Sequence, residues 1–364
     1  MKIAFTMNIF IKNYCLKMNK QRVLVLFSLL LSILGIYFVI HFYKIFFWSN
    51  TNFSNNYSYV YIDRDDNVDS LLIHLKPILK SLKYFSIAAE KKGFFSKVRP
   101  GKYRIKRGMG NNDIVNLLRT ERLTTKVVFN NLERLEDLAA RISKQIEADS
   151  VELLNAFKNE KFLKSLGFTS ETALAMYLPN TYDFFWDVTP EDFRNRMLEY
   201  YNLFWNEERV RKANALNLSP IEVYILASIV QKESLRSEEQ NIISGVYHNR
   251  LRKNMKLQAD PTVIYAIKKK ERNFKKIIRR VLYRDLKLNS PYNTYRYKGL
   301  TPGPICMPNL STIEAVLNPG IHNYLYFVAS PTDPGFHLFS KNYSEHIRNK
   351  KLYTEWLNRN KLFR

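Results

Sequence analysis

The sequence predicts an α+β fold class: one transmembrane helix near the N-terminus, a small mixed module, and a larger helix-rich domain. Three observations support this class. Residues 23–43 contain no Asp, Glu, Lys or Arg over 21 positions. Strand-like and helix-like patterns alternate over residues 57–120, and helix-start signals recur over residues 121–364. These are the patterns of a membrane span, a small α+β unit and a helical α+β domain, respectively.

Composition narrows the classes of protein before any motif is considered. The 364 residues include 57 Lys and Arg against 33 Asp and Glu, a formal charge of +24. A hydrophobic content of 46% excludes a wholly disordered chain, and two cysteines exclude a disulfide-rich secreted scaffold. The charge favours nucleic acid, an anionic membrane or an acidic polymer as partner. Alternatively, Lys, Asn, Ile, Phe and Tyr share A/T-rich codons, so a biased genome would raise all of them together.

The apolar run over residues 23–43 is long enough to cross a bilayer as one helix. Residues 1–22 form a basic tail without acids, which predicts a cytoplasmic N-terminus and an extracytoplasmic remainder. A cleaved signal peptide is the alternative, but the run exceeds a signal core of about 7–15 residues and lacks a small-x-small cleavage site. Residues 44–56 are expected to be a juxtamembrane linker. The basic residues of the tail are Lys2, Lys12, Lys17, Lys20 and Arg22.

This topology also decides what the two cysteines can do. Cys15 is expected on the cytoplasmic side and Cys306 on the other side, so they cannot pair within one chain. Cys306 is therefore expected to be a small buried apolar residue rather than a nucleophile.

Residues 57–120 have the pattern of one small α+β module. Their order is strand, helix, helix, strand, helix, with Gly93 closing the second helix. The expected elements are a strand over 59–62, helical spacing from 68 to 82, a helix over 85–92, a strand over 102–105 and a helix over 113–119.

Within residues 121–364, one helix presents a candidate catalytic acid. Ser219 and Glu222 form a capping box that begins this helix, as Thr189 and Pro190 begin an earlier one. Glu233 lies on the same apolar face of the helix as three residues that precede it by three, four and seven positions. Burial would raise the pKa of its carboxyl and keep it protonated, as a general acid requires. Alternatively, the helix simply ends there and Glu233 is solvated or pairs with an Arg. The apolar residues are Leu226, Ile229 and Val230.

The next segment adds candidate binding residues. Ser237 and Gln240 suggest a second capping box, and a helix through Arg252 follows. Asp260 is expected to cap the helix that Pro261 opens. Gln258 lies on the loop before it, where polar side chains are often exposed for binding. Arg250 and Asp260 could also pair with each other as a purely structural contact.

Two further segments offer groups suited to a sugar polymer. The loop over 290–308 combines tyrosines, Asn, Thr and a Pro-Gly-Pro turn, which supply aromatic faces and hydrogen-bonding groups. Tyr292, Asn293 and Tyr295 are its candidates. His337 lies on the second strand of a hairpin expected over 324–329 and 336–339, although a lone His is more often structural than catalytic.

Several kinds of site are excluded by missing motifs. The chain has no HExxH or CxxC, so zinc hydrolase chemistry has no ligand set. It also has no P-loop and no G-x-S-x-G elbow. We therefore expect no metal and no organic cofactor.

Six segments in order carry a family resemblance. They are LASIVQKES, GVYHNRL, LQADPTVIYA, SPYNTYRYKGLTPGPI, LNPGIHNYLYFVA and FHLFSK. Together they closely resemble the endolytic murein transglycosylase (YceG-like) family, from about residue 57 to the C-terminus. The resemblance implies a LysM-like module at 57–120 that contacts peptidoglycan, and a YceG-like catalytic domain at 121–364.

The resemblance also implies a reaction and a setting. The catalytic glutamate maps to Glu233, followed by Ser234 where Thr is common. The implied enzyme is a lyase that cuts the β-1,4 bond from N-acetylmuramic acid to N-acetylglucosamine, leaves 1,6-anhydro ends, and terminates the growth of nascent strands. It would act at the inner (cytoplasmic) membrane, beside peptidoglycan synthases. His337 follows a Pro-Gly-Phe turn that matches the family's Gly-Gly-His turn only loosely. Together with the candidates taken from the sequence itself, the predicted substrate-binding set is Gln258, Asp260, Tyr292, Asn293, Tyr295 and His337.

Three alternatives remain open. A muramidase would hydrolyse the same bond and leave reducing ends, and Asp260 could then be the second carboxylate that hydrolysis requires. A non-catalytic, membrane-anchored protein could bind peptidoglycan without cutting it. A nucleic-acid binder is disfavoured, because the expected topology places the basic domains outside the cytoplasm.

Overall fold

We describe a computed structural model of the chain, and the structure describes residues 20–360. The predictions made for most of the basic tail, and for Cys15, lie outside the described residues. By contacts, the chain divides into two compact units. Within the described residues, the first unit comprises 20–124 with 185–187, and the second comprises 125–184 with 188–360.

The apolar run forms one continuous helix, α2 (Lys20–Phe46), which is three residues longer at each end than the predicted span. Among the described residues, it is the helix that by itself has the length and composition to cross a membrane. Its apolar side chains are exposed, as Val39 (68%) and Phe38 (65%) illustrate. Such exposure is costly in water and favourable in lipid.

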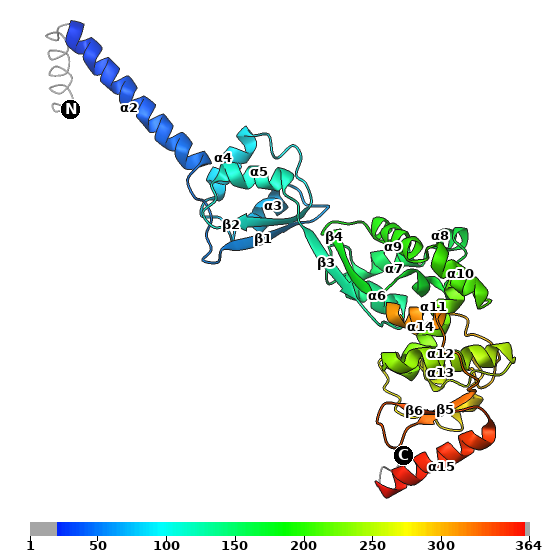
Figure 1. The fold of residues 1–364 in the computed structure, drawn as a ribbon. Helices are drawn as coiled ribbons and strands as arrows, with labels where there is room; N and C mark the ends of the chain where they lie inside the picture. Colours follow the sequence, from blue (N-terminus) through cyan, green and yellow to red (C-terminus); the bar gives the residue numbers. More distant parts are fainter. Residues whose placement is uncertain (1–19, 361–364) are drawn as a thin grey trace. The chain divides into compact units, whose positions relative to one another are not determined.

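The first unit contains the predicted β-α-α-β-α order (Figure 1). The strands β1 and β2 pair antiparallel, with Tyr57 opposite Lys106 and Ile62 opposite Gly101. Gly93 has a φ of +63°, which glycine adopts without strain, and it ends the second helix as expected. The elements are β1 (Tyr57–Ile62), α3 (Val68–Leu75), α4 (Leu82–Lys91), β2 (Gly101–Lys106) and α5 (Asn111–Thr120).

Part of the expected linker is instead built into this unit. Asn50 and Thr51 are buried, and Ser49 and Thr51 form isolated β-bridges with Gly110 and Leu79. The Asn50 amide donates to Oδ1 of Asn111 at 2.7 Å, a polar contact that the local sequence did not reveal. The helical spacing predicted over 68–82 is interrupted, because α3 ends at Leu75 and α4 begins at Leu82, and Leu79 between them forms the bridge with Thr51.

The second unit is helix-rich with two short two-stranded sheets, which confirms the predicted α+β class. The sheets are β3 with β4 and β5 with β6. Its first elements are β3 (Thr124–Phe129), α6 (Leu135–Ile142), α7 (Ser150–Phe157), α8 (Glu160–Ser165), η1 (Ala173–Met176), β4 (Asn180–Phe185), α9 (Pro190–Phe204) and α10 (Glu207–Ala215). The rest are α11 (Pro220–Glu233), α12 (Ser237–Arg252), α13 (Asp260–Glu271), η2 (Asp285–Lys287), α14 (Leu310–Leu317), β5 (Tyr326–Ala329), β6 (His337–Ser340) and α15 (Tyr343–Arg359).

Helix α11 lies in the centre of the second unit's core. Every residue from Val223 to Gln231 is buried, and α12, α13 and α14 all pack on this helix. Its N-terminus is held by the predicted capping box, in which Ser219 accepts from the Glu222 N–H and Glu222 accepts from the Ser219 N–H. A helix fixed at its start and buried along its length places its last residue, Glu233, at a defined point.

Two predicted caps are wrong. Ser237 is the first residue of α12, and Arg236 precedes it without a side-chain cap; Gln240 instead donates to the Ser234 carbonyl at 3.0 Å. Asp260 is likewise the first residue of α13 and does not cap that helix. In both cases the side chain expected at the cap, Gln240 or Asp260, forms a hydrogen bond with another part of the chain instead.

Candidate active site

Glu233, the last residue of α11, is half-buried at the edge of a cleft. The three apolar residues predicted to share its face are completely buried. The carboxylate of Glu233 therefore lies where α11 emerges from the apolar core. The Tyr247 hydroxyl, from α12, donates to Oε1 of Glu233 at 2.7 Å. Tyr247 is itself buried, so this hydrogen bond fixes one carboxylate oxygen.

The cleft has a volume of about 530 Å³ and is built from segments that are distant in sequence. The ends of α11 and α13, one face of α12, the β5–β6 hairpin and α15 all contribute to it. The structure therefore brings together five of the seven predicted site residues. These are Glu233, Gln258, Asp260, Tyr295 and His337.

Burial raises the pKa of Glu233 to about 7, and the charge of nearby Asp260 adds to the rise. The Tyr247 hydrogen bond and the Arg250 charge oppose it, because both favour the carboxylate. A carboxyl with a pKa near neutrality is populated in both protonation states around pH 7. It can therefore donate a proton in one step and accept a proton in a later step.

Arg250 organises the backbone around the cleft instead of pairing with Asp260. Its Nε donates to the Leu325 carbonyl and its Nη1 to the Leu257 carbonyl, each at 2.6 Å. These bonds connect α12 to the segment before β5 and to the residue before Gln258. Asp260 accepts from the Tyr295 hydroxyl at 2.6 Å, so its partner is a tyrosine of the 290–308 loop.

Gln258 has a left-handed backbone conformation, with a φ of +51°. Its N–H donates to the Thr294 carbonyl at 3.2 Å, and the next N–H donates to the Thr294 hydroxyl at 3.0 Å. A non-glycine residue in this region costs on the order of 1 kcal/mol and persists only where its surroundings impose it. The surrounding bonds thus hold the exposed Gln258 side chain at the cleft.

His337 is held by a carboxylate that sequence reasoning missed. Both oxygens of Glu239 are occupied, Oε1 by the His337 N–H and Oε2 by Nδ1 of the same ring, each at 2.8 Å. Glu239 is buried near the start of α12, and only tertiary packing brings it to β6. No pattern in the sequence indicated that Glu239 would contact His337. A glutamate in the first turn of a helix is expected there simply because its charge is favourable to the helix dipole.

Two predicted binding residues do not line the cleft. Tyr292 is buried and its hydroxyl donates to Oε2 of Glu171 at 2.6 Å. Asn293 is also buried, where its amide donates to the carbonyls of Leu286 and Leu288 and its Oδ1 accepts from the Tyr295 N–H. Both side chains stabilise the loop that carries Tyr295, and neither is free to meet a ligand.

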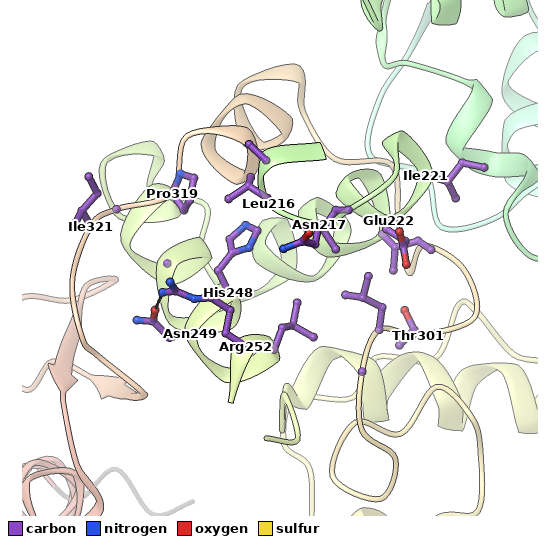
Figure 2. A pocket seen from close by; sticks show the side chains of 18 of the residues that line it. Leu216, Asn217, Ile221, Glu222, His248, Asn249, Arg252, Thr301, Pro319 and Ile321 are labelled. Carbon is purple, nitrogen blue, oxygen red and sulfur yellow. Dashed lines mark hydrogen bonds between the residues drawn. The ribbon is translucent and has the colours of Figure 1, made fainter. Parts of the chain in front are cut away.

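A larger cavity, of about 1120 Å³, lies away from Glu233. Figure 2 shows that the α12 residues His248, Asn249 and Arg252 line it. Tyr247 and Arg250 of the same helix line the cleft instead. Burial lowers the pKa of His248, whose Nε2 bonds the Val316 carbonyl at 3.1 Å. The polar groups of α12 on this side thus mostly serve the fold, so the smaller cleft is the candidate active site.

Other reactive groups are accounted for elsewhere. Cys306 is completely buried, as predicted, and burial raises the pKa of its thiol to about 12. In the part of the chain that the structure describes, one group of side chains has metal-ligand spacing: Asp63, Asp66 and His74 of the first unit. Asp66 already bonds the Asp63 N–H at 2.8 Å and lies 3.2 Å from the His74 ring nitrogen. Internal contacts therefore satisfy this group.

Comparison with known proteins shows the family of this chain. The sequence matches the YceG-like family over residues 60–352. A Bacillus subtilis (strain 168) protein named endolytic murein transglycosylase is 31% identical over 294 residues, which cover 76% of this chain and 78% of that protein. Streptococcus pneumoniae proteins of the same name are 37% identical over 133 residues, 36% of this chain and 24% of theirs.

A solved structure gives the same result at the level of the fold. The crystal structure of a yceG-like protein from Listeria monocytogenes aligns with a TM-score of 0.54 and 26% identity. The alignment covers 81% of this chain and 99% of that one. On the family match and the Bacillus subtilis relative, this chain belongs to the YceG-like family.

Proposed function

We propose that the protein is an endolytic murein transglycosylase, a lyase that cuts peptidoglycan strands internally at the bond from N-acetylmuramic acid to N-acetylglucosamine. The observation that carries the proposal is Glu233, a half-buried carboxyl with a pKa of about 7 that faces a polar and aromatic cleft. The relatives' shared name supports the substrate and reaction.

The proposed reaction needs one protein carboxyl. Protonated Glu233 donates its proton to the glycosidic oxygen as the C1–O bond breaks, releasing the N-acetylglucosamine side as an alcohol. The resulting carboxylate then accepts the proton of the muramic C6 hydroxyl while that oxygen bonds to C1. The product is a 1,6-anhydro end, and Glu233 is protonated again. A general acid/base of this kind supplies roughly 10²–10⁴-fold, and positioning in the cleft supplies more.

The other cleft residues fit substrate binding. Gln258 and Tyr295 offer an amide and an aromatic ring, and His337 is oriented by Glu239. Asp260 lies in the same cleft, where its charge favours the protonated form of Glu233. Tyr292 and Asn293 act indirectly in this scheme, because they stabilise the loop that bears Tyr295.

The proposal extends to the chain's organisation. Residues 23–43 would span the cytoplasmic membrane once, with the N-terminus in the cytoplasm and the catalytic domain, 121–364, outside. The first unit's residues 57–120 would be a LysM-like module that contacts peptidoglycan. In this arrangement the enzyme would terminate nascent strands beside membrane-bound peptidoglycan synthases. Depletion should then lengthen the average glycan strand in isolated cell wall, and an unchanged strand length would contradict that role.

A muramidase is the rival that one observation favours, because Asp260 lines the same cleft as Glu233 and hydrolysis uses two carboxylates. Mass spectrometry of digested glycan separates the two reactions. Anhydro-muramic ends, one water lighter than reducing ends, are expected. Reducing ends would establish the muramidase instead.

A further inference from the structure

Helix α15 forms a wall of the cleft that the proposed reaction does not use. The helix packs on β5 and β6 and supplies four of the residues that line the cleft. Tyr343, His346, Ile347 and Lys350 follow one another at positions i, i+3, i+4 and i+7, so they lie on one face of the helix. We call these four residues the α15 face.

The ammonium group of Lys350 is a positive charge without a partner. Lys350 is exposed, and among residues 20–360 its side chain has no hydrogen bond, ion pair or contact with an aromatic ring. The next residue differs, because Nζ of Lys351 lies 3.9 Å from Oε1 of Glu355. Lys350 is therefore available to an anionic group that enters the cleft.

The other basic groups beside the cleft are neutral or already engaged. Burial lowers the pKa of His346, and the positive charges of Lys350 and Arg250 lower it further, so the ring is mostly neutral at pH 7. Arg250 donates to two backbone carbonyls, and its guanidinium lies 5.2 Å from the centroid of the Tyr326 ring. Lys350 thus supplies the free positive charge of this wall.

The rest of the α15 face suits the uncharged part of a peptide. The His346 ring stacks on Tyr326, with centroids 5.1 Å apart and planes 23° apart. Tyr343 and Ile347 are 62% and 43% exposed. Nδ1 of His346 is buried without a hydrogen-bond partner within the described structure, which is unusual for a polar atom. The face therefore combines apolar surface, an unpaired polar atom and a cation.

Packing alone does not account for this face. No residue of α15 (343–359) is buried, although the helix lies against a two-stranded sheet. A helix face that served only to cover a sheet would be apolar and buried. The α15 face instead turns polar and charged groups toward a cleft that also holds Glu233.

The proposed substrate would bring an anionic peptide to this cleft. A stem peptide is attached to N-acetylmuramic acid, the sugar whose C1 reacts in the proposed step. A muramic residue seated at Glu233 would therefore carry its peptide into the cleft or along its rim. The two kinds of sugar ring in the strand are neutral, so the carboxylates of the stem peptides are the groups that a lysine would bind.

We propose that the α15 face is a stem-peptide subsite, in which Lys350 binds a carboxylate of the peptide attached to the reacting sugar. Tyr343, His346 and Ile347 contact the uncharged part of that peptide. The inference rests on the proposed function for its substrate class. It assigns to α15 a preference for strands with charged stem peptides, and it gives Lys350 no part in the proton transfers at Glu233.

Binding to short fragments tests Lys350 separately from cleavage. The full chain with Glu233→Gln is purified in detergent micelles and titrated calorimetrically with soluble peptidoglycan fragments that retain their stem peptides. In a second set of fragments, a carbodiimide and ammonia convert the carboxylates to carboxamides. The Glu233→Gln protein should bind the native fragments about fivefold more tightly than the carboxamide fragments, as expected for one exposed ion pair.

Three further variants are made in the same Glu233→Gln chain. Lys350→Gln should weaken binding of the native fragments about fivefold and leave binding of the carboxamide fragments unaltered. Lys350→Arg keeps the charge and should retain most of the affinity. Arg348→Gln is the matched control and should bind both sets normally, because Arg348 is an exposed cation of the same helix that does not line the cleft.

Three results would overturn the inference. The first is that the Glu233→Gln protein does not bind the native fragments. The second is unchanged binding of those fragments by Lys350→Gln, and the third is equal weakening for both sets, which would give Lys350 a purely structural role. The proposed function fails on a different result: native fragments that bind the chain with Glu233 intact but are not cut would contradict the lyase and leave the subsite standing.

Discussion

At the residue scale, burial raises the pKa of Glu233, the hydrogen bond from Tyr247 lowers it, and the charges of Asp260 and Arg250 add smaller shifts in opposite directions. The helical spacing predicted its shared face with Leu226, Ile229 and Val230, because i, i+3, i+4 and i+7 geometry is local. Tyr247 and Glu239 could not be predicted as partners of Glu233 and His337. Those contacts depend on how α12 packs against α11 and β6, which no local spacing encodes.

The rate of cleavage should depend on pH through Glu233. Because the acid must be protonated, kcat/KM should fall as the pH rises through about 7. Tyr247→Phe removes a hydrogen bond that favours the carboxylate, so the pKa of Glu233 should rise. The fall should then move up by about one pH unit. A pH–rate profile of both proteins checks this, and an unmoved profile in the variant would show that another group is titrating.

The same burial should make Glu233 a destabilising residue at high pH. Its pKa in the folded protein lies above the unfolded value, so its contribution to stability is complete below about pH 4.5 and is lost as the pH rises through 7. Glu233→Gln should therefore increase the free energy of unfolding by about 1–3 kcal/mol at pH 8 and change it little at pH 4. Denaturant unfolding at the two pH values measures this. An equal effect at both would indicate a packing change rather than removal of a charge.

At the scale of elements, the strands and helices of the first unit could be predicted from the sequence, whereas the packing of the residues just before them could not. The strands β1 and β2 and the helix closed by Gly93 follow from alternation, apolar spacing and one turn residue. The linker predicted over 44–56 includes Asn50 and Thr51, which are buried by partners about 60 and 30 residues away. Polar composition indicates loops only where no distant group satisfies the side chains.

Residues of helix α12 line both the cleft at Glu233 and the larger cavity, and the packing of this helix should be intolerant of added volume. A Cβ at Gly245 would lie 2.5 Å from the Gly320 carbonyl oxygen and 2.6 Å from Nε2 of His322. Gly245→Ala should therefore cost about 1–3 kcal/mol of stability, because overpacking against backbone exceeds the gain in helix propensity.

The neighbouring position supplies the control. Ser244 is buried with no hydrogen-bond partner for its hydroxyl within the described structure, so Ser244→Ala should be neutral or slightly stabilising. Thermal unfolding of both variants separates close packing from a general sensitivity of the helix. If Gly245→Ala is as stable as the parent, residues 319–323 must shift at little energetic cost to accommodate the added methyl group.

At the scale of the whole molecule, the distribution of charge supports one orientation. The chain has a formal charge of +24, and its first 22 residues contain basic but no acidic side chains. If residues 23–43 span the membrane, this flank keeps the N-terminus inside. The cations that remain would then meet anionic lipid and stem-peptide carboxylates, so nucleic acid is not the natural partner of this basic chain.

Cysteine labelling tests this orientation directly. With a membrane-impermeant maleimide on intact protoplasts, Ser96→Cys, at an exposed position of the first unit, should label. Cys15 should label only after permeabilisation, and Cys306 should stay unlabelled in the folded protein because it is buried. Labelling of Cys15 in intact protoplasts would reverse the topology.

In the proposed reaction, Glu233 alone provides the acid and the base for an intramolecular transfer within the substrate. The direct measurement is mass spectrometry of the products from purified peptidoglycan incubated with the parent protein and with Glu233→Gln. We expect internal cuts with 1,6-anhydro-muramic ends for the parent, and at least about a 10²-fold loss of those products for the variant. Reducing ends from the parent, or cleavage that survives in Glu233→Gln, would contradict it.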